Sequence, residues 1–470
     1  MGGIARRTGN PTIIWRALSL ALSLALALVL AVTVAPQLQP NAVAAVQPGD
    51  RVAAPGSGFH WGVATSGFQV EGSNPDSNWK RYVDATSPTG HTDPVGDAVD
   101  FWNRYEEDIA NAAAMGVNTF RLGVEWARIE PAPGEYDDEA LRHYDRIIDT
   151  VRRNGMTPMI TMVHFVYPGW LADRGGMLAD TAVESFGRFA DLITDRWAGD
   201  GTMWVTFNEP LVFFKHEMTI GRVQFTDFSR FLDHIEAAHR LGYAAAHRAD
   251  PEAMVTMNEA YLPLATDFTD TLIGDRVADV VDYVGIDYYY GVALNNLTAI
   301  NAAWDDFAAV RPQPEGIYEA IEHYARSYPG KPLYIVENGM PTRDGGRVDG
   351  IERGDFLRDT VFWLQRAVAD GYPVIGYNHW SLVDNYEWGD YSARFGLYRV
   401  DVLGDPTLTR QPTSGVDAYR DVISAGGVPD GYRPVLPTAW CSLATVPDTC
   451  IGPVSAEGPL AHLAGSRAAR

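Results

Sequence analysis

The sequence predicts an α/β fold, a (β/α)8 TIM barrel that forms a single catalytic domain over residues 55–425. Short apolar runs alternate along the chain with amphipathic stretches, and there are eight such runs. A continuous apolar run is typical of a strand buried on both faces, as in a parallel sheet covered by helices. The runs are Phe59–Val63, Thr119–Val124, Pro158–Val163, Met203–Thr206, Met254–Met257, Tyr283–Ile286, Leu333–Val336 and Val374–Tyr377.

The stretches between the runs have helical patterns. Tyr144, Ile147, Ile148 and Val151 recur at the spacing of one helix face. Pairs that end in glycine, such as Asn154-Gly155, are typical of helix C-termini. Eight strand-then-helix units favour a closed barrel, and a doubly wound open sheet is the alternative. No glycine-rich phosphate loop follows the first run, which disfavours a dinucleotide site.

Composition narrows the class of function. The 470 residues are 46% apolar and carry a net charge of −23, which indicates an acidic globular protein. Nucleic-acid binding requires clustered Lys and Arg, so no nucleic-acid partner is expected. The chain has no His-x-x-x-His pair or Cys cluster at metal spacing, so neither a metal nor another cofactor is expected. The oligomeric state stays open.

The first 45 residues have the pattern of an export signal. Arg6, Arg7 and Arg16 precede an apolar run from Ala17 to Ala35, and a small-x-small sequence follows at 42–44. The run is long enough that an uncleaved membrane anchor is an alternative to a cleaved signal peptide. In both cases the folded part lies outside the cytoplasm, and membrane association involves only this segment.

The two cysteines lie in the C-terminal tail, residues 426–470. An exported chain favours a disulfide between Cys441 and Cys450. Since both lie outside the predicted barrel, thiol catalysis is disfavoured.

Polar and aromatic residues gather where the apolar runs stop. The C-terminal ends of barrel strands carry the active site in this fold. In chain order these residues are Gln69 and Glu71, Arg121, Glu125 and Trp126, His164, Asn208-Glu209, Asn258-Glu259, Asp287 to Tyr290, Glu337 to Gly339, and Asn378 to Trp380.

Carboxylates stand out at this predicted rim. Paired carboxylates among sugar-binding groups are the arrangement of glycosidases. Glu209, Glu259 and Glu337 compete for the two roles, and composition does not rank them. The stretch Thr206–Pro210 has two interpretations, a strand that ends on a functional Glu209 and a helix start with an ordinary first-turn acid.

Several ordered motifs resemble glycoside hydrolase family 1, over about residues 59–419. They are Phe59–Ser66 with Gln69–Gly72, Phe120-Arg121 with Trp126–Pro131, His164, Thr206–Pro210, Tyr334–Gly339, Trp380–Trp388 and Arg394–Leu397. The resemblance implies a retaining β-glycosidase that releases a terminal β-D-glycosyl residue from a small-molecule β-glycoside, with β-glucosidase as the first expectation. A β-galactosidase, a transglycosidase and a non-catalytic sugar-binding protein are the alternatives.

The same resemblance implies residue roles. Glu337 would be the nucleophile and Glu209 the general acid/base. Arg121 and Tyr289 would keep the nucleophile ionised, and Asn208 would hold the sugar 2-hydroxyl. The remaining sugar contacts would be Gln69, His164, Glu387 and Trp388, with Trp380 as the floor. Glu259 would support the site or line a subsite.

The sequence departs from the family pattern in three places. The segment between Asn258 and Asp282 is short, which predicts a more open leaving-group side. Asp287 stands where an asparagine is usual, so a second acid near Glu337 is expected to raise neighbouring carboxyl pKa values. The spacing from Glu387 to Arg394 is tight, which leaves the surroundings of the sugar 6-position open. A phosphorylated sugar is not expected, because no Ser-x-Lys-x-Tyr run is present.

Overall fold

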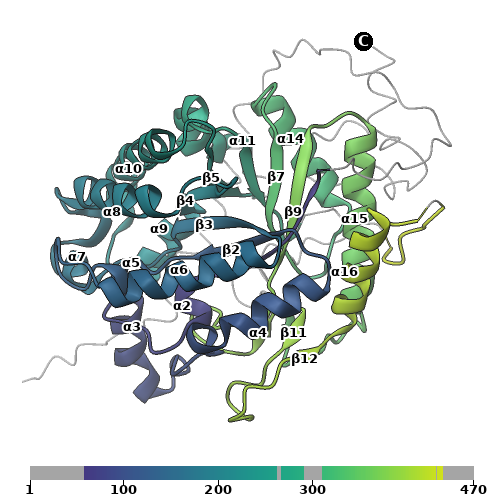
Figure 1. Cartoon of the computed structure of the whole chain (residues 1–470), viewed down its shortest axis with the longest axis horizontal. Coiled ribbons are helices and arrows are strands. Elements are labelled where there is room, and N and C mark those ends of the chain that lie inside the picture. The colour runs from purple at the N-terminus through teal and green to yellow at the C-terminus, as the bar shows by residue number, and fades with distance from the viewer. Residues whose placement is uncertain (1–57, 262–265, 291–309, 430, 438–470) are drawn as a thin grey trace, which may run out of the picture. The chain divides into compact units, whose positions relative to one another are not determined.

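Eight parallel strands close into a barrel (Figure 1). The structure, a computed structural model, describes residues 58–261, 266–290, 310–429 and 431–437. Closure confirms the predicted fold class and excludes the open doubly wound sheet. The strands are β1 (His60–Ala64), β2 (Thr119–Gly123), β3 (Thr157–Val163), β4 (Met203–Asn208), β5 (Met254–Ala260), β6 (Val284–Asp287), β7 (Leu333–Asn338) and β9 (Val374–Trp380).

Helices cover the outside of the barrel, and all predicted strand runs fall on its strands. The helices are α2 (Gly67–Val70), α3 (Asn78–Thr86), α4 (Phe101–Ala114), α5 (Trp126–Ile129), α6 (Asp138–Arg153), α7 (Gly169–Asp173), α8 (Ala182–Trp197), α9 (Pro210–Thr219), α10 (Phe228–Ala249), α11 (Thr266–Thr269), α12 (Asp275–Val277), α14 (Gly316–Ser327), α15 (Arg353–Ala369) and α16 (Ser414–Ala425). Short two-residue strands are β8 (Thr342–Arg343), β10 (Ala393–Arg394), β11 (Tyr398–Arg399) and β12 (Gln411–Pro412).

Helix α6 shows how the sequence builds these elements. Asp137 caps its N-terminus, where the side chain accepts hydrogen bonds from the backbone N–H groups of Glu139 and Ala140. Tyr144, Ile147, Ile148 and Val151 are buried, as their spacing predicts. Gly155 has a φ of 77°, a left-handed conformation that ends the helix at low steric cost.

Several strands run further than their apolar runs. β4 ends at Asn208, β5 at Ala260, β7 at Asn338 and β9 at Trp380. Polar residues predicted to follow these strands are therefore their last paired residues, because ladder hydrogen bonds involve only the backbone. Asn208 pairs with Asn258, and Asp287 pairs with Glu337. This register holds four polar side chains at one end of the barrel.

The barrel interior below that end is filled with side chains. Its central cluster consists of Met159, Met203, Val205, Tyr283, Tyr334 and Val336. The interior is tight enough that glycine is required at some points. A Cβ on Gly62 would lie 1.9 Å from Oδ1 of Asn378, and a Cβ on Gly376 would lie 2.3 Å from the Tyr334 ring.

We expect Gly62→Ala to lower the free energy of unfolding by about 1–3 kcal/mol, because the added methyl overpacks the barrel. Urea unfolding at neutral pH measures the change. Gly346→Ala is the control, since no heavy atom lies within 4 Å of the added Cβ there. An equal loss in both variants would contradict the packing argument.

The first part of the C-terminal tail packs on α15. Asp359 accepts hydrogen bonds from the Tyr432 hydroxyl and from the backbone N–H groups of Val435 and Leu436, at 2.7, 3.0 and 2.7 Å. The segment 1–45 and the cysteines Cys441 and Cys450 lie outside the described residues. Within the ranges described, no helix is both long and apolar enough to cross a membrane.

Candidate active site

Glu337 lies near the end of β7 and is only 3% exposed. The fully buried guanidinium of Arg121, from β2, forms an ion pair with its Oε1. The hydroxyl of Tyr289 donates a hydrogen bond to Oε2 at 2.6 Å. Opposite charge and hydrogen bonds to the charged form both favour an ionised carboxylate. Glu337 is therefore held as an oriented anion.

Arg121 connects this carboxylate to β3 and β4. Its Nε donates to Oγ1 of Thr161 at 2.9 Å, and its Nη2 donates to Oδ1 of Asn208 at 2.6 Å. The Asn208 amide nitrogen lies 3.4 Å from Oε2 of Glu209. Two side chains, Arg121 and Asn208, thus link the carboxyl groups of Glu337 and Glu209.

Glu209 occupies the junction between β4 and α9. Its φ and ψ are 39° and 71°, and Pro210 opens the helix directly after it. Its backbone N–H still bonds to the carbonyl of Asn258 at 3.1 Å. Glu209 directly follows the last residue of β4 and stands at the N-cap position of α9, where its side chain makes no capping hydrogen bond. It is therefore not the first-turn acid of the helix-start interpretation.

Glu209 is suited to hold a proton near neutrality. Its side chain is partly exposed at the rim. Burial and then the negative charge of Glu337 raise its pKa to about 8. One carboxyl that holds a proton and one that stays ionised form the pair that acid-assisted displacement needs.

Asp287, the last residue of β6, joins the same network. Asn258 donates from its amide nitrogen to Oδ1 of Asn208, at 2.7 Å, and to Oδ2 of Asp287. Among the described residues, Oδ1 of Asp287 has no hydrogen-bond partner. Burial, followed by the charges of Glu337 and Glu209, raises the Asp287 pKa well above its usual range. This environment favours the neutral form of Asp287 beside the ion pair.

Asn258 was expected at the rim but was assigned no role, and the structure places it in the site network. Glu259 drew attention because it is a carboxyl, but strand residues alternate between the two faces of a sheet. Asn258 faces the barrel interior, and Glu259 faces the surrounding helices. Alternation along β5 would have identified the inward residue.

Glu259 lies behind the barrel wall. The Tyr328 hydroxyl at the end of α14 is 3.4 Å from its Oε1. Burial and then Asp270 raise its pKa to about 8. Because its side chain points away from Glu337, a mechanism that uses Glu259 as a catalytic carboxyl is contradicted.

The side chains predicted for sugar binding surround Glu337 on the β1, β3 and β9 side. Gln69 is fully buried, accepts from the Ser66 hydroxyl at 2.6 Å and donates to the Tyr386 carbonyl at 2.9 Å. One amide N–H remains for another acceptor. The Trp380 indole nitrogen lies 3.4 Å from Oε1 of Glu387.

His164 lies between two indole rings. Its ring centroid is 5.6 Å from Trp380 and 5.9 Å from Trp388, at interplanar angles of 15° and 12°. Burial, then Arg121 and His216, lower its pKa well below the usual value, so the imidazole is neutral. Its Nδ1 has no hydrogen-bond partner within the described part of the chain. A neutral ring with a spare nitrogen suits a sugar hydroxyl.

Glu387 is a third proton-holding carboxyl at the rim. It is partly exposed, and its pKa is raised to about 8, mainly by burial. The hydrogen bond from Trp380 lowers this pKa, and the charge of Glu337 raises it. A protonated carboxyl donates as well as accepts a hydrogen bond, which matches a hydroxyl ligand.

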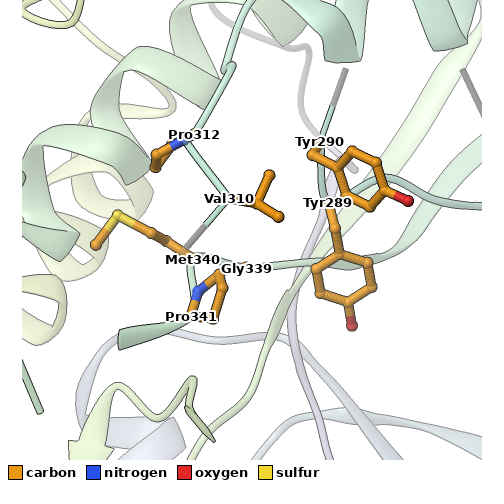
Figure 2. Close-up of a pocket in the computed structure, with 7 residues that line it drawn as sticks. All are labelled: Tyr289, Tyr290, Val310, Pro312, Gly339, Met340 and Pro341. Atoms are coloured by element: carbon orange, nitrogen blue, oxygen red, sulfur yellow. The ribbon is translucent and has the colours of Figure 1, made fainter. Parts of the chain in front are cut away.

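The tyrosines after β6 take different directions. Tyr288 donates to the Gln313 carbonyl at 2.5 Å and is a packing residue. Figure 2 shows Tyr289 and Tyr290 across a narrow space from Val310. The cavity there has a volume of about 10 Å³, enough for one water molecule. This cavity is too small for a sugar ring.

The closed barrel, with an anionic and a proton-holding carboxyl at its strand ends, defines a glycoside hydrolase. The chain belongs to glycosyl hydrolase family 1, whose sequence profile matches residues 54–262 and 277–428. It is therefore an O-glycosyl hydrolase that acts on glycosides. The gap between the two matched ranges, residues 263–276, falls in the segment between β5 and β6.

Curated relatives and solved structures agree with this family. A 1,4-beta-D-glucan glucohydrolase of Thermotoga neapolitana is 27% identical over 79% of this chain and 99% of that relative. A beta-galactosidase of Sulfolobus acidocaldarius is 26% identical over 79% of this chain and 96% of its own length. A beta-glucosidase from Thermotoga maritima in complex with deoxynojirimycin is 25% identical with a TM-score of 0.66, covering 80% of this chain and 100% of that one.

Proposed function

We propose that this enzyme hydrolyses terminal β-D-glucosyl residues by double displacement, with Glu337 as the nucleophile and Glu209 as the acid/base. One observation carries the proposal. Arg121 and Tyr289 hold Glu337 as an anion, while Glu209, on the same Arg121–Asn208 bridge, holds a proton.

The reaction has two steps. A Glu337 oxygen bonds to the anomeric carbon as the bond to the leaving oxygen breaks, and Glu209 gives that oxygen its proton. The ionised Glu209 then takes a proton from water, whose oxygen displaces Glu337 from the sugar. Both carboxyls return to their starting state, and the two inversions retain the β configuration. Transfer to an acceptor other than water uses the same steps.

Sugar contacts follow from the side chains around Glu337. Asn208, fixed by Arg121 and Asn258, is placed to hold the 2-hydroxyl next to the reacting carbon. Gln69, His164, Glu387 and Trp388 bind the other hydroxyls, and the Trp380 indole forms the floor under the apolar face of the sugar. The short segment between β5 and β6 leaves the leaving-group side more open.

A panel of p-nitrophenyl β-glycosides tests the proposal. We expect the highest kcat/KM with the glucoside, and proton NMR should show the β anomer as the first product. Preference for the galactoside would support the alternative glycone, which the named relatives include. Saturable glycoside binding without turnover would support a sugar-binding protein. An α anomer as first product would overturn the double displacement.

Asp287→Asn should move the alkaline limb of the pH profile of kcat/KM to lower pH by roughly half a unit or more. An ionising Asp287 adds negative charge near Glu209 and raises its pKa, and the amide cannot. The stability of the variant relative to wild type should also increase as the pH rises. The wild-type carboxyl binds its proton more tightly folded than unfolded, so it costs stability above its unfolded pKa. Thermal unfolding from pH 5 to 8 measures this second effect. An unchanged pH profile of kcat/KM, together with an unchanged pH dependence of the unfolding temperature, would contradict the role of Asp287.

We also propose that the catalytic domain over residues 55–425 is exported through residues 1–45 and that Cys441 and Cys450 form a disulfide. N-terminal sequencing of protein from the culture medium distinguishes a cleaved signal from an anchor. A mass gain on reduction and alkylation tests the disulfide.

A further inference from the structure

A cavity of about 220 Å³ opens between the loops that follow β7 and β9. Four arginines line it, Arg347, Arg353, Arg394 and Arg399, against the two acids Glu352 and Asp384. In a chain with 37 Lys and Arg against 60 Asp and Glu, this is a local reversal of charge. None of the residues assigned to the active site lines the cavity, so it is a separate feature.

Arg394 brings unsatisfied hydrogen-bond donors to this cavity. The residue is 8% exposed, yet among the described residues its Nε and Nη1 have no hydrogen-bond partner. Asp384 is 4.0 Å from Nη1, and Asp401 is 3.5 Å from Nη2. By contrast Arg410, also 8% exposed, directs Nε and Nη2 to the carboxylate of Asp108, each at 2.9 Å.

Arg353 adds a second buried cation. It is 5% exposed, and its recorded hydrogen bonds go to the backbone carbonyls of Met340 and Arg394. Burial lowers its pKa to about 10, partly offset by Asp384. A buried guanidinium that lacks a close carboxylate costs free energy until an anion approaches it.

The acids that line the cavity do not neutralise it. Asp384 uses both oxygens on backbone N–H groups, those of Gly396 at 2.9 Å and Val400 at 3.1 Å. Glu352 is exposed at the rim and accepts from the Ser414 hydroxyl at 3.2 Å. The first residues of α15 and α16, Arg353 and Ser414, also line the cavity. The positive ends of two helix dipoles are therefore directed to it.

We propose that this arginine cavity binds a tetrahedral oxyanion, a phosphate or sulfate group. Guanidinium groups bind such oxyanions through paired N–H donors, and several of them can share its oxygens. The volume accommodates one such group with a few water molecules at about 30 Å³ each. The rim at Gly345, Gly346 and Arg399 is exposed, so the anion can enter from solvent.

Titration calorimetry with inorganic phosphate in an oxyanion-free buffer at constant ionic strength tests the site. We expect saturable phosphate binding with a dissociation constant below about 10 mM. Sulfate should bind in the same way, and chloride should not bind. Arg394→Gln should abolish it, and Arg399→Gln, an exposed change that spares the fold, should weaken it about fivefold or more. Arg420→Gln, which removes an exposed arginine paired with Asp417, should bind as wild type does.

Methyl phosphate distinguishes the source of the anion. Tighter binding than inorganic phosphate indicates a phosphate ester, and equal or weaker binding indicates the free ion. No saturable binding, or equal binding by wild type and Arg399→Gln, would overturn the proposal. Because binding is measured without turnover, the result does not depend on the proposed hydrolase activity.

Discussion

We expect Glu337→Gly to abolish glucoside hydrolysis, with kcat lower by at least about four orders of magnitude, the usual loss when a covalent nucleophile is removed. The variant leaves Arg121 without its carboxylate partner but opens space beside the anomeric carbon. Added azide should occupy that space and give a glycosyl azide of α configuration, because it attacks once from the face that Glu337 occupied.

Two controls separate chemistry from folding in that experiment. Glu259→Gln removes another buried strand-end carboxyl, but one that faces the helices, so kcat should stay near the wild-type value. Loss of a buried ion-pair partner is destabilising, so circular dichroism is needed to check that Glu337→Gly is folded. Full activity in Glu337→Gly would remove this residue as the nucleophile.

We expect Glu209→Ala to lower kcat/KM by about 10²–10⁴-fold on substrates with poor leaving groups, the usual contribution of a general acid. With 2,4-dinitrophenyl β-glucoside, the first step should remain fast, because this phenolate leaves without a proton. The second step still lacks its base, so a burst of phenolate followed by slow turnover is expected. Azide should restore turnover and give the β-glycosyl azide.

The two azide products distinguish the two carboxyls. The α product of Glu337→Gly reports one displacement, and the β product of Glu209→Ala reports two. Equal losses of Glu209→Ala activity on good and poor leaving groups would contradict its role as proton donor. The same anomer from both variants would contradict the assignment of separate roles.

Much of the fold could be predicted from the sequence, because each barrel strand is buried on both faces and leaves a continuous apolar run. The ends of several strands were predicted too early, because their last residues carry polar side chains. Residues such as Asn208 and Glu337 pair through their backbones, while their side chains face a polar site. Hydrophobic pattern follows burial of side chains and does not detect backbone pairing.

The candidate site was predicted in part. The motifs that resemble the family indicated Glu209, Glu337 and their neighbours, and the structure brings these side chains together. Asn258 was expected at the rim but was given no role, because it has no titratable group and stands beside Glu259. The arginine cavity has no local sequence signal at all. Its four arginines come from a loop, the start of α15 and the short strands β10 and β11, which only the folded barrel brings together.

A covalent label on Glu337 tests the central claim most directly. A 2-deoxy-2-fluoro-β-glucosyl fluoride should react once per chain, since the 2-fluorine slows both steps and the fluoride leaves readily. Mass spectrometry of the digested protein should then find one fluoroglucosyl group on the peptide that contains Glu337, and none in Glu337→Gly. A label on another residue, or turnover with no covalent species and with inverted product, would contradict the account.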